Sequence, residues 1–275
     1  MRIVIAASLL LPVAALAASP FTGTWMTRAD SMKSSGTPDV FLVMDGTYTC
    51  SSCVPEIRIR ADGTDQKVTG HPYYDTVAVK VVSATAVELS DKLAGRQTVH
   101  VRLTVSPDGK TLTGDYADDT GAKTATGSFQ QRRVAAGPAG SHAMSGSWQD
   151  ARMVSGNEAT RTVHYAMTAD GFSSQWNGLA YSAKFDGRQY PIKGDPGHTL
   201  VEVRKIDDHT VLEIDRRLGK VTDEMHMAVA SDGKSVAVID HDLNHGRIVT
   251  FTLDRQRSPL ALRFVTREPA APPSK

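Results

Sequence analysis

Two cysteines, spaced as Cys50-Ser-Ser-Cys53, have the types and spacing best suited to chemistry in this 275-residue chain. Such a pair can form a short disulfide, act as a redox dithiol or supply two ligands to a metal. A redox pair sits at a helix N-terminus, whereas the flanking residues read as strand, loop and proline. A metal would need two more ligands, and His71 is the one candidate nearby in sequence. We predict a structural Cys50–Cys53 disulfide that fixes local geometry, with the redox and metal sites as alternatives.

A second group of polar and aromatic side chains lies in the segment from His71 to Asp75, between two expected strands. We predict that His71, Tyr73, Tyr74, Asp75 and, in the matching loop of a sequence repeat, His198 bind a ligand at a barrel mouth. The alternative is a rim loop whose tyrosines cover the open end. The matching loop lacks the aromatic residues, which counts against a duplicated active site, so no catalytic residue is proposed.

Three further histidines, His226, His241 and His245, form the richest imidazole group. His241 and His245 would share a face on a helix, but they fall where a hairpin turn is expected. We therefore predict a solvated turn and no metal site.

Motifs of well-known enzyme classes are missing from the sequence. It contains no GxSxG elbow, HExxH motif, Walker loop or Rossmann glycine fingerprint. No cofactor is expected, and an enzyme is less favoured than a binding protein. The 31 basic and 30 acidic residues leave a net charge of +1, and 6% aromatic residues offer no platform for stacking bases. Nucleic acid is therefore not an expected partner.

The first residues have the pattern of an export signal. Arg2 precedes an apolar run from residue 3 to 15, and Ala15-Leu16-Ala17 fits a cleavage site. We predict a signal peptide over residues 1–17 and a periplasmic or secreted protein. The run is too short to span a bilayer, so no membrane span is expected.

The rest of the chain alternates apolar and polar residues with a period of two. In residues 99–105 every odd position is apolar and every even position is polar. Asp-Gly and Thr-Gly turns separate such segments at strand-length intervals. The pattern predicts antiparallel meanders of about eight to ten strands per domain, which curl closed or split into a sandwich.

The sequence also contains an internal repeat. A shift of 124 residues aligns residues 62–110 with 186–234, and 14 of the 49 positions are identical. We predict a first β-barrel domain over residues 18–134, a linker at 135–143, a second β-barrel domain at 144–266 and a disordered tail at 267–275.

Each half begins with a GxW element, Gly23-Thr24-Trp25 and Gly146-Ser147-Trp148, followed by a strand series. In this the chain resembles the lipocalin or calycin family of barrels. With its segment DGKTLT at 108–113, it also resembles a loose group of exported bacterial proteins. The resemblance implies an all-β fold of two tandem, antiparallel, up-and-down barrels or half-barrels related by duplication.

A barrel of this size can hold one small ligand. We therefore expect an exported, non-catalytic protein that binds a small apolar ligand or a protein partner. The alternatives are an envelope enzyme, with its site at a barrel rim or in the cleft between the domains, and a structural envelope module.

Overall fold

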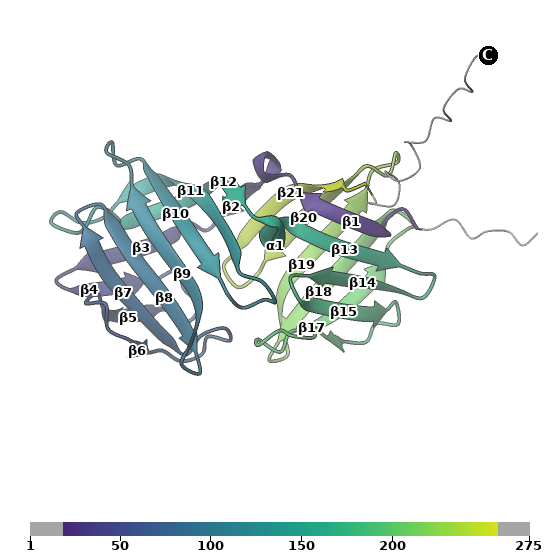
Figure 1. Ribbon diagram of the computed structural model, residues 1–275, viewed down its shortest axis with the longest axis horizontal. Coiled ribbons are helices and arrows are strands. Elements are labelled where there is room, and N and C mark those ends of the chain that lie inside the picture. The colour runs from purple at the N-terminus through teal and green to yellow at the C-terminus, as the bar shows by residue number, and fades with distance from the viewer. Residues whose placement is uncertain (1–18, 258–275) are drawn as a thin grey trace, which may run out of the picture.

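The protein consists of two antiparallel β-barrels lying side by side (Figure 1). The computed structural model describes residues 19–257, so the predicted signal peptide (1–17) and tail (267–275) lie outside the described residues. Within this range the helical elements are one short turn of 3-10 helix, η1 (Ala29–Ser31), and one turn of α-helix, α1 (Glu158–Arg161). The predicted all-β fold with two barrels is therefore confirmed.

The first barrel is a sheet of ten strands in the order β5-β4-β3-β12-β11-β10-β9-β8-β7-β6. Its strands are β3 (Asp39–Met44), β4 (Thr47–Cys50), β5 (Ile57–Arg60), β6 (Gln66–Lys67), β7 (Thr76–Ser83), β8 (Ala86–Leu93), β9 (Arg96–Val105), β10 (Thr111–Asp118), β11 (Ala125–Ala136) and β12 (Gly146–Gly156). A bridge between Asp62 and Lys80 joins the two ends of the sheet and nearly closes the barrel.

The second barrel repeats this plan in the order β15-β14-β13-β1-β21-β20-β19-β18-β17-β16, with β2 paired to β21 beside the main path. Its strands are β1 (Gly23–Thr27), β2 (Lys33–Gly36), β13 (Thr162–Met167), β14 (Gly171–Trp176), β15 (Leu179–Lys184), β16 (Tyr190–Pro191), β17 (Leu200–Lys205), β18 (Thr210–Arg217), β19 (Lys220–Val229), β20 (Ser235–Asp242) and β21 (Arg247–Arg255). A bridge between Ala180 and Lys193 brings the sheet ends together.

The two halves of the chain exchange their first strands. Strand β1 pairs with β13 and β21 of the second barrel, while β12 pairs with β11 and β3 of the first. In Figure 1 the purple β1 accordingly lies among the green and yellow strands of the second barrel. The sheets thus depart from the contiguous ranges 18–134 and 144–266, because each takes its GxW strand from the other range.

The exchange creates two crossing segments between the barrels. One runs from β1 through η1 and β2 to β3, and the other from β12 through α1 to β13. They pack on each other, since β12 contacts both η1 and β2. Two covalent crossings and their mutual contact therefore join the barrels, whereas the β11–β12 hairpin lies within the first barrel.

Each barrel is closed around the tryptophan of its exchanged strand. Trp148 is fully buried in the first barrel, with the guanidinium of Arg133 lying 4.0 Å from its ring centre. Trp25 is fully buried in the second, with Arg255 at 4.1 Å. Each indole N–H donates to a backbone carbonyl four residues earlier, that of Met144 at 2.8 Å or Phe21 at 2.9 Å.

The two arginines also tie neighbouring loops to the tryptophans. Arg133 donates to the carbonyls of Gly109, Ser145 and Ala143. The guanidinium of Arg255 binds the carbonyls of Gly233, Thr22 and Pro20 in the same way. A desolvated guanidinium over an indole contributes about 2 kcal/mol, and its hydrogen bonds to carbonyls add to this. The period-two pattern supplies the remaining inward side chains, such as Val79, Leu103 and Leu112 in the first barrel.

The exchange gives Trp148 an effect that its place in the sequence would not suggest. We expect Trp148→Ala to lower the free energy of unfolding by about 3–5 kcal/mol, because it leaves a large cavity in the core. The first barrel is the one that loses stability. Amide hydrogen exchange should therefore accelerate in β3 and β11 more than in β13 and β14, although Trp148 belongs to the second repeat.

Trp25→Ala is the matched variant and should show the reverse distribution, with faster exchange in β13 and β21. If each variant instead accelerated exchange mainly in the strands of its own sequence repeat, the strand exchange would be wrong.

Candidate functional site

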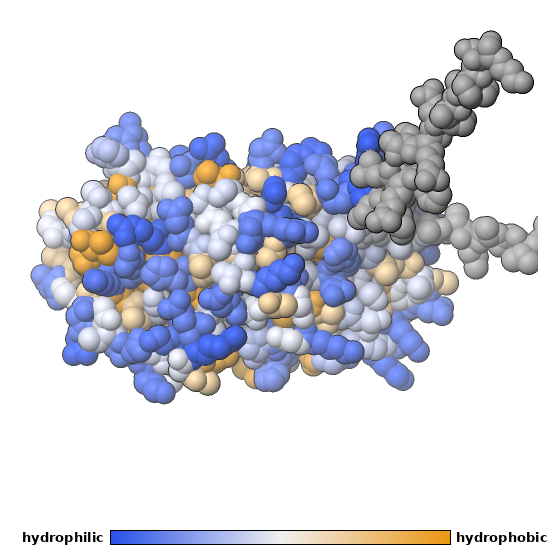
Figure 2. Space-filling model, viewed as in Figure 1, coloured by the Kyte–Doolittle hydropathy of each residue, from blue (hydrophilic) through white to orange (hydrophobic). Residues whose placement is uncertain are grey.

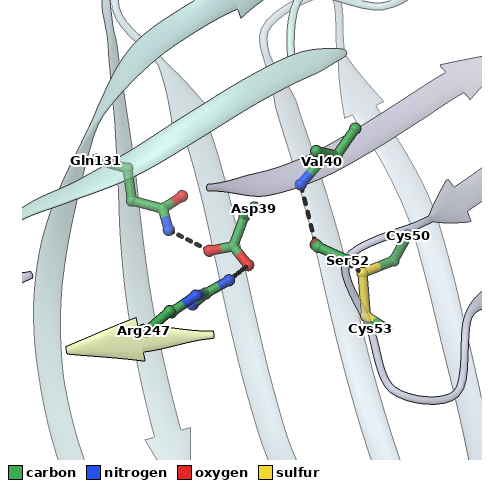
Figure 3. Close-up of a disulfide and its surroundings, with 7 residues drawn as sticks. All are labelled: Asp39, Val40, Cys50, Ser52, Cys53, Gln131 and Arg247. Carbon is green, nitrogen blue, oxygen red and sulfur yellow. Dashed lines mark hydrogen bonds and ion pairs between the residues drawn. A yellow bond between two sulfur atoms is a disulfide. The ribbon is translucent and has the colours of Figure 1, made fainter. Parts of the chain in front are cut away.

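The cysteine pair forms a disulfide, as predicted. The Cα atoms of Cys50 and Cys53 are 5.4 Å apart and the S–S bond measures 2.05 Å. Cys50 ends β4 and is 1% exposed. The hydroxyl of Ser52, between the cysteines, accepts a hydrogen bond from the Val40 N–H at 2.9 Å (Figure 3). The disulfide therefore fixes the turn after β4 against β3.

The predicted ligand-binding loop lies where the barrels touch. The ring of Tyr73 packs on Gly197, where an added Cβ would be 2.8 Å from the Tyr73 ring. The guanidinium of Arg217 lies 5.5 Å from the centre of the same ring. The loops around residues 73 and 197 are equivalent in the repeat, so matching loops of the two barrels meet at this contact.

The other predicted residues of this loop turn toward the first barrel. His71 stacks on Tyr74 with ring centres 4.6 Å apart, and Tyr74 packs against the first core. Burial lowers the pKa of His71 and raises the pKa of Tyr74 to about 12. His71 and Tyr74 therefore contact the first barrel, whereas Tyr73, their neighbour in sequence, contacts the second.

Asp75 and His198 have structural roles. The carboxylate of Asp75 accepts hydrogen bonds from the N–H of Ala94 at 3.0 Å and the hydroxyl of Thr76 at 2.8 Å, which lower the pKa of Asp75. His198 has a φ of +51°, and its N–H donates to the carbonyl of Asp195 in a tight turn. Ligand binding by the five predicted residues stays a prediction, while their visible contacts shape two loops and the contact between barrels.

A second contact between the barrels is made by the turn after β14. Asn177 receives the Lys123 N–H on its side-chain oxygen at 3.0 Å and donates to the Lys123 carbonyl at 2.9 Å. Its own carbonyl accepts the Ala122 N–H at 2.7 Å. The side chain thus copies the pairing of a strand and fixes the loop before β11.

A third contact inserts a charge from the second barrel into the first. Arg247, which begins β21, binds Asp39 at 2.5 Å (Figure 3). It also lies 3.9 Å from Asp150. Gln131, only 4% exposed, donates to both carboxylates, at 2.6 Å to Asp39 and 2.8 Å to Asp150. Breaking so enclosed a network by removing one partner is costly, so it holds the barrels in register.

Beside this network is a cavity of about 210 Å³ between the two barrels. Its walls come from Met32, which follows η1, from β2 and β21, and from β10, β11 and β12. They are formed by Met32, Ser34, Tyr116, Phe129, Gln130, Asp150, Ala151, Arg152, Met153 and Val249. The Ser34 hydroxyl is buried and has no hydrogen-bond partner in the described part of the chain. The cavity is therefore lined by apolar side chains together with the polar side chains of Gln130, Asp150 and Arg152, and Ser34, whose hydroxyl has no partner, lies in its wall.

The barrel interiors, where the sequence placed a ligand, are lined by buried side chains of their own. In the second barrel Phe21, Trp25 and Phe172 are at most 1% exposed and pack edge to face or into the surrounding core. In the first barrel Trp148 and Leu112 are fully buried. The cavity at the junction is therefore the stronger candidate for a ligand site.

The second barrel carries more inward-facing acids than the first. Its Asp215 and Asp242 are matched by Asp91 and Asp118 of the first barrel, but its other inward acids are not. Glu213, Met225 and Asp240 are register partners across β18, β19 and β20. The equivalent positions of the first barrel hold Leu89, Val101 and Tyr116. One step further along the strands the same face carries three more acids, Asp215, Asp223 and Asp242.

Burial raises the pKa of several of these acids. Glu213 is 7% exposed and is hydrogen-bonded by the Tyr181 hydroxyl, and burial with nearby carboxylates raises its pKa. The pKa of Asp215 is raised for the same reasons, and that of Asp240 is raised to about 6. Arg217, 3.2 Å from Asp223, is the cation in the group. Some carboxyl groups of this cluster are therefore protonated near neutral pH.

The histidines do not build a metal centre. The ring centres of His226 and His241 lie 6.1 Å apart, and His245 contacts Asp242 at 2.6 Å. Over residues 19–257 no group of three or more histidine, cysteine or acidic side chains could hold a metal ion. Strand β20 continues to Asp242, so the predicted turn is confined to residues 243–246.

Sequence reasoning missed the acidic face and the junction cavity. The acidic face could have been found from the alternation of side chains along β19. Asp223 lies two residues before Met225 and four before Met227, so it faces the barrel interior as they do. The cavity depends on the strand exchange, which has no local signal.

Comparisons with known proteins place this chain in no established group: no family model, no curated protein and no solved structure matches it.

The acidic face predicts a particular dependence of stability on pH. In the unfolded chain these carboxyls ionise near pH 4, whereas their folded pKa values are higher. Folding is therefore penalised progressively as the pH rises from about 4 through 6 and above. We expect Asp215→Asn to match the wild type near pH 4 and to be more stable than it near pH 8, as measured by urea unfolding.

Asp170→Asn, an exposed turn position of the same barrel, is the control and should leave the pH profile unchanged. Equal stability of Asp215→Asn and wild type across this pH range would show that Asp215 is not held protonated by the fold.

Proposed function

We propose that this chain is an exported, non-catalytic binding protein built from two lipocalin-type barrels. Its ligand is a small, largely apolar molecule with one hydrogen-bonding group, bound at the junction of the barrels. The observation that carries the proposal is the cavity whose walls include Phe129, Met153 and Val249 and whose buried Ser34 hydroxyl has no partner.

The lining supports this class of ligand. Met32, Tyr116, Phe129, Met153 and Val249 supply thioether, aromatic and aliphatic surface. A buried hydroxyl without a partner is unfavourable, so a ligand that hydrogen-bonds to Ser34 removes a cost of the free protein. A volume of about 210 Å³ lies below the usual range for drug-sized ligands, which favours a molecule of one ring or a short chain.

The face of the molecule shown in Figure 2 gives less support to a protein partner. The face in Figure 2 is mainly hydrophilic, and its hydrophobic residues are scattered in small spots. Isolated exposed apolar residues are ordinary on a protein surface, whereas an interface is marked by a larger patch.

The Cys50–Cys53 disulfide supports export, because such a bond persists in oxidising compartments. Export through the predicted signal peptide at residues 1–17 is part of the proposal.

Two probes that differ by one hydroxyl test the site. We expect 4-methylphenol to bind more tightly than toluene, because only the phenol can hydrogen-bond to Ser34. Ser34→Ala should weaken binding of 4-methylphenol by about two- to tenfold and leave toluene binding unchanged, as measured by isothermal titration calorimetry.

Ser35→Ala is the matched control, since Ser35 is the exposed neighbour on the same strand. Met153→Trp should fill the cavity and abolish binding of both probes. The proposal fails if neither probe binds the wild type, or if Ser34→Ala and Ser35→Ala have the same effect.

A further inference from the structure

A second and larger hollow, of about 490 Å³, lies on the outer wall of the first barrel. Its sides are formed by β9 and β10, which contribute His100, Arg102 and Asp115, and by the end of β12, which contributes Ser155. It is separate from the function proposed above, although Tyr116 borders both cavities.

At the edge of the hollow the end of β12 packs closely on β11. After Gly156 the chain turns into α1, and Asn157 ties this turn to β11 through its N–H to the Thr126 carbonyl at 2.9 Å. A Cβ on Gly127 would lie 2.6 Å from the Ser155 carbonyl oxygen and the Tyr116 hydroxyl, so glycine permits this close approach. The matching position of the second barrel, which pairs with β20, carries Val249. The close approach is therefore a feature of the first barrel.

Several polar side chains surround the hollow, and two of them are held by partners. The Arg102 guanidinium pairs with Glu88 at 2.5 Å, and the His100 Nδ1 lies 3.0 Å from the Ser90 hydroxyl. Asp115 makes no side-chain hydrogen bond or ion pair within the described residues, so its carboxylate is available as an acceptor. The remaining N–H groups of Arg102 are available as donors.

These groups match a ligand rich in hydroxyls. Each hydroxyl both donates and accepts, and adjacent hydroxyls can bridge a carboxylate and a guanidinium on neighbouring strands. Asp115 and Glu88 oppose an anion, whereas Arg102 opposes a cation. No large aliphatic side chain lines the hollow, which disfavours an apolar ligand. We propose that this outer hollow binds a neutral saccharide unit through Asp115, Arg102 and His100.

Protein-detected NMR tests the proposal on the full chain, with maltose, cellobiose and N,N′-diacetylchitobiose as probes at millimolar concentration. At least one probe should shift the amide resonances of Ala117, Gly127 and Asn157. Asp115→Ala should weaken that binding by about tenfold, because a hydrogen bond to a charged group is lost. Asp115 is exposed, so the variant should keep the wild-type spectrum elsewhere.

Thr113→Ala, at the preceding outward position of β10, is the matched control and should bind as the wild type does. Ser34→Ala should also bind saccharide normally, so that failure here is distinguishable from failure at the junction cavity. The proposal is overturned if no probe shifts these amides, or if Asp115→Ala and Thr113→Ala bind equally well.

Discussion

Each barrel closes on a tryptophan supplied by the other half of the chain. Trp25 and Trp148 are fully buried, and each is covered by an arginine whose remaining donors hold the surrounding loops. Because β1 and β12 carry these side chains into opposite barrels, neither half holds its own central tryptophan. The crossing segments, the junction cavity and the Arg247 network all follow from this exchange.

The two barrels share a plan but differ at corresponding positions. Leu89 and Tyr116 of the first barrel correspond in register to Glu213 and Asp240 of the second. Gly127 of the first barrel, which lets Ser155 and Tyr116 approach closely beside the outer hollow, corresponds to Val249. Substitutions that leave the Trp–Arg centre intact thus give each barrel a different interior and surface. One proposed ligand site lies where the two barrels differ, and the other lies at their junction. Neither is a site that occurs in both barrels.

Much of the fold could be predicted from the sequence, because period-two alternation and Asp-Gly turns are local signals. The disulfide followed from the spacing of Cys50 and Cys53. The strand exchange could not be predicted, since the two GxW strands are equivalent and either can pair in either barrel. The loop of Tyr73 was recognised as unusual, but its contact with Gly197 depends on how the barrels lie together. Ser34 carries no motif and gains meaning only from the cavity beside it.

The central claim is that exchanged strands hold the two barrels together. The most direct test is to cut the chain between the two sequence halves, so that β1 and β12 lie on different fragments. A specific protease site inserted at the exposed Ala139–Gly140 segment separates the chain after β11 and before β12. After cleavage, native mass spectrometry and size-exclusion chromatography without denaturant should find the two fragments as one complex, because each still contributes a strand to the other's barrel. Fragments that separate into two folded monomers would contradict the exchange.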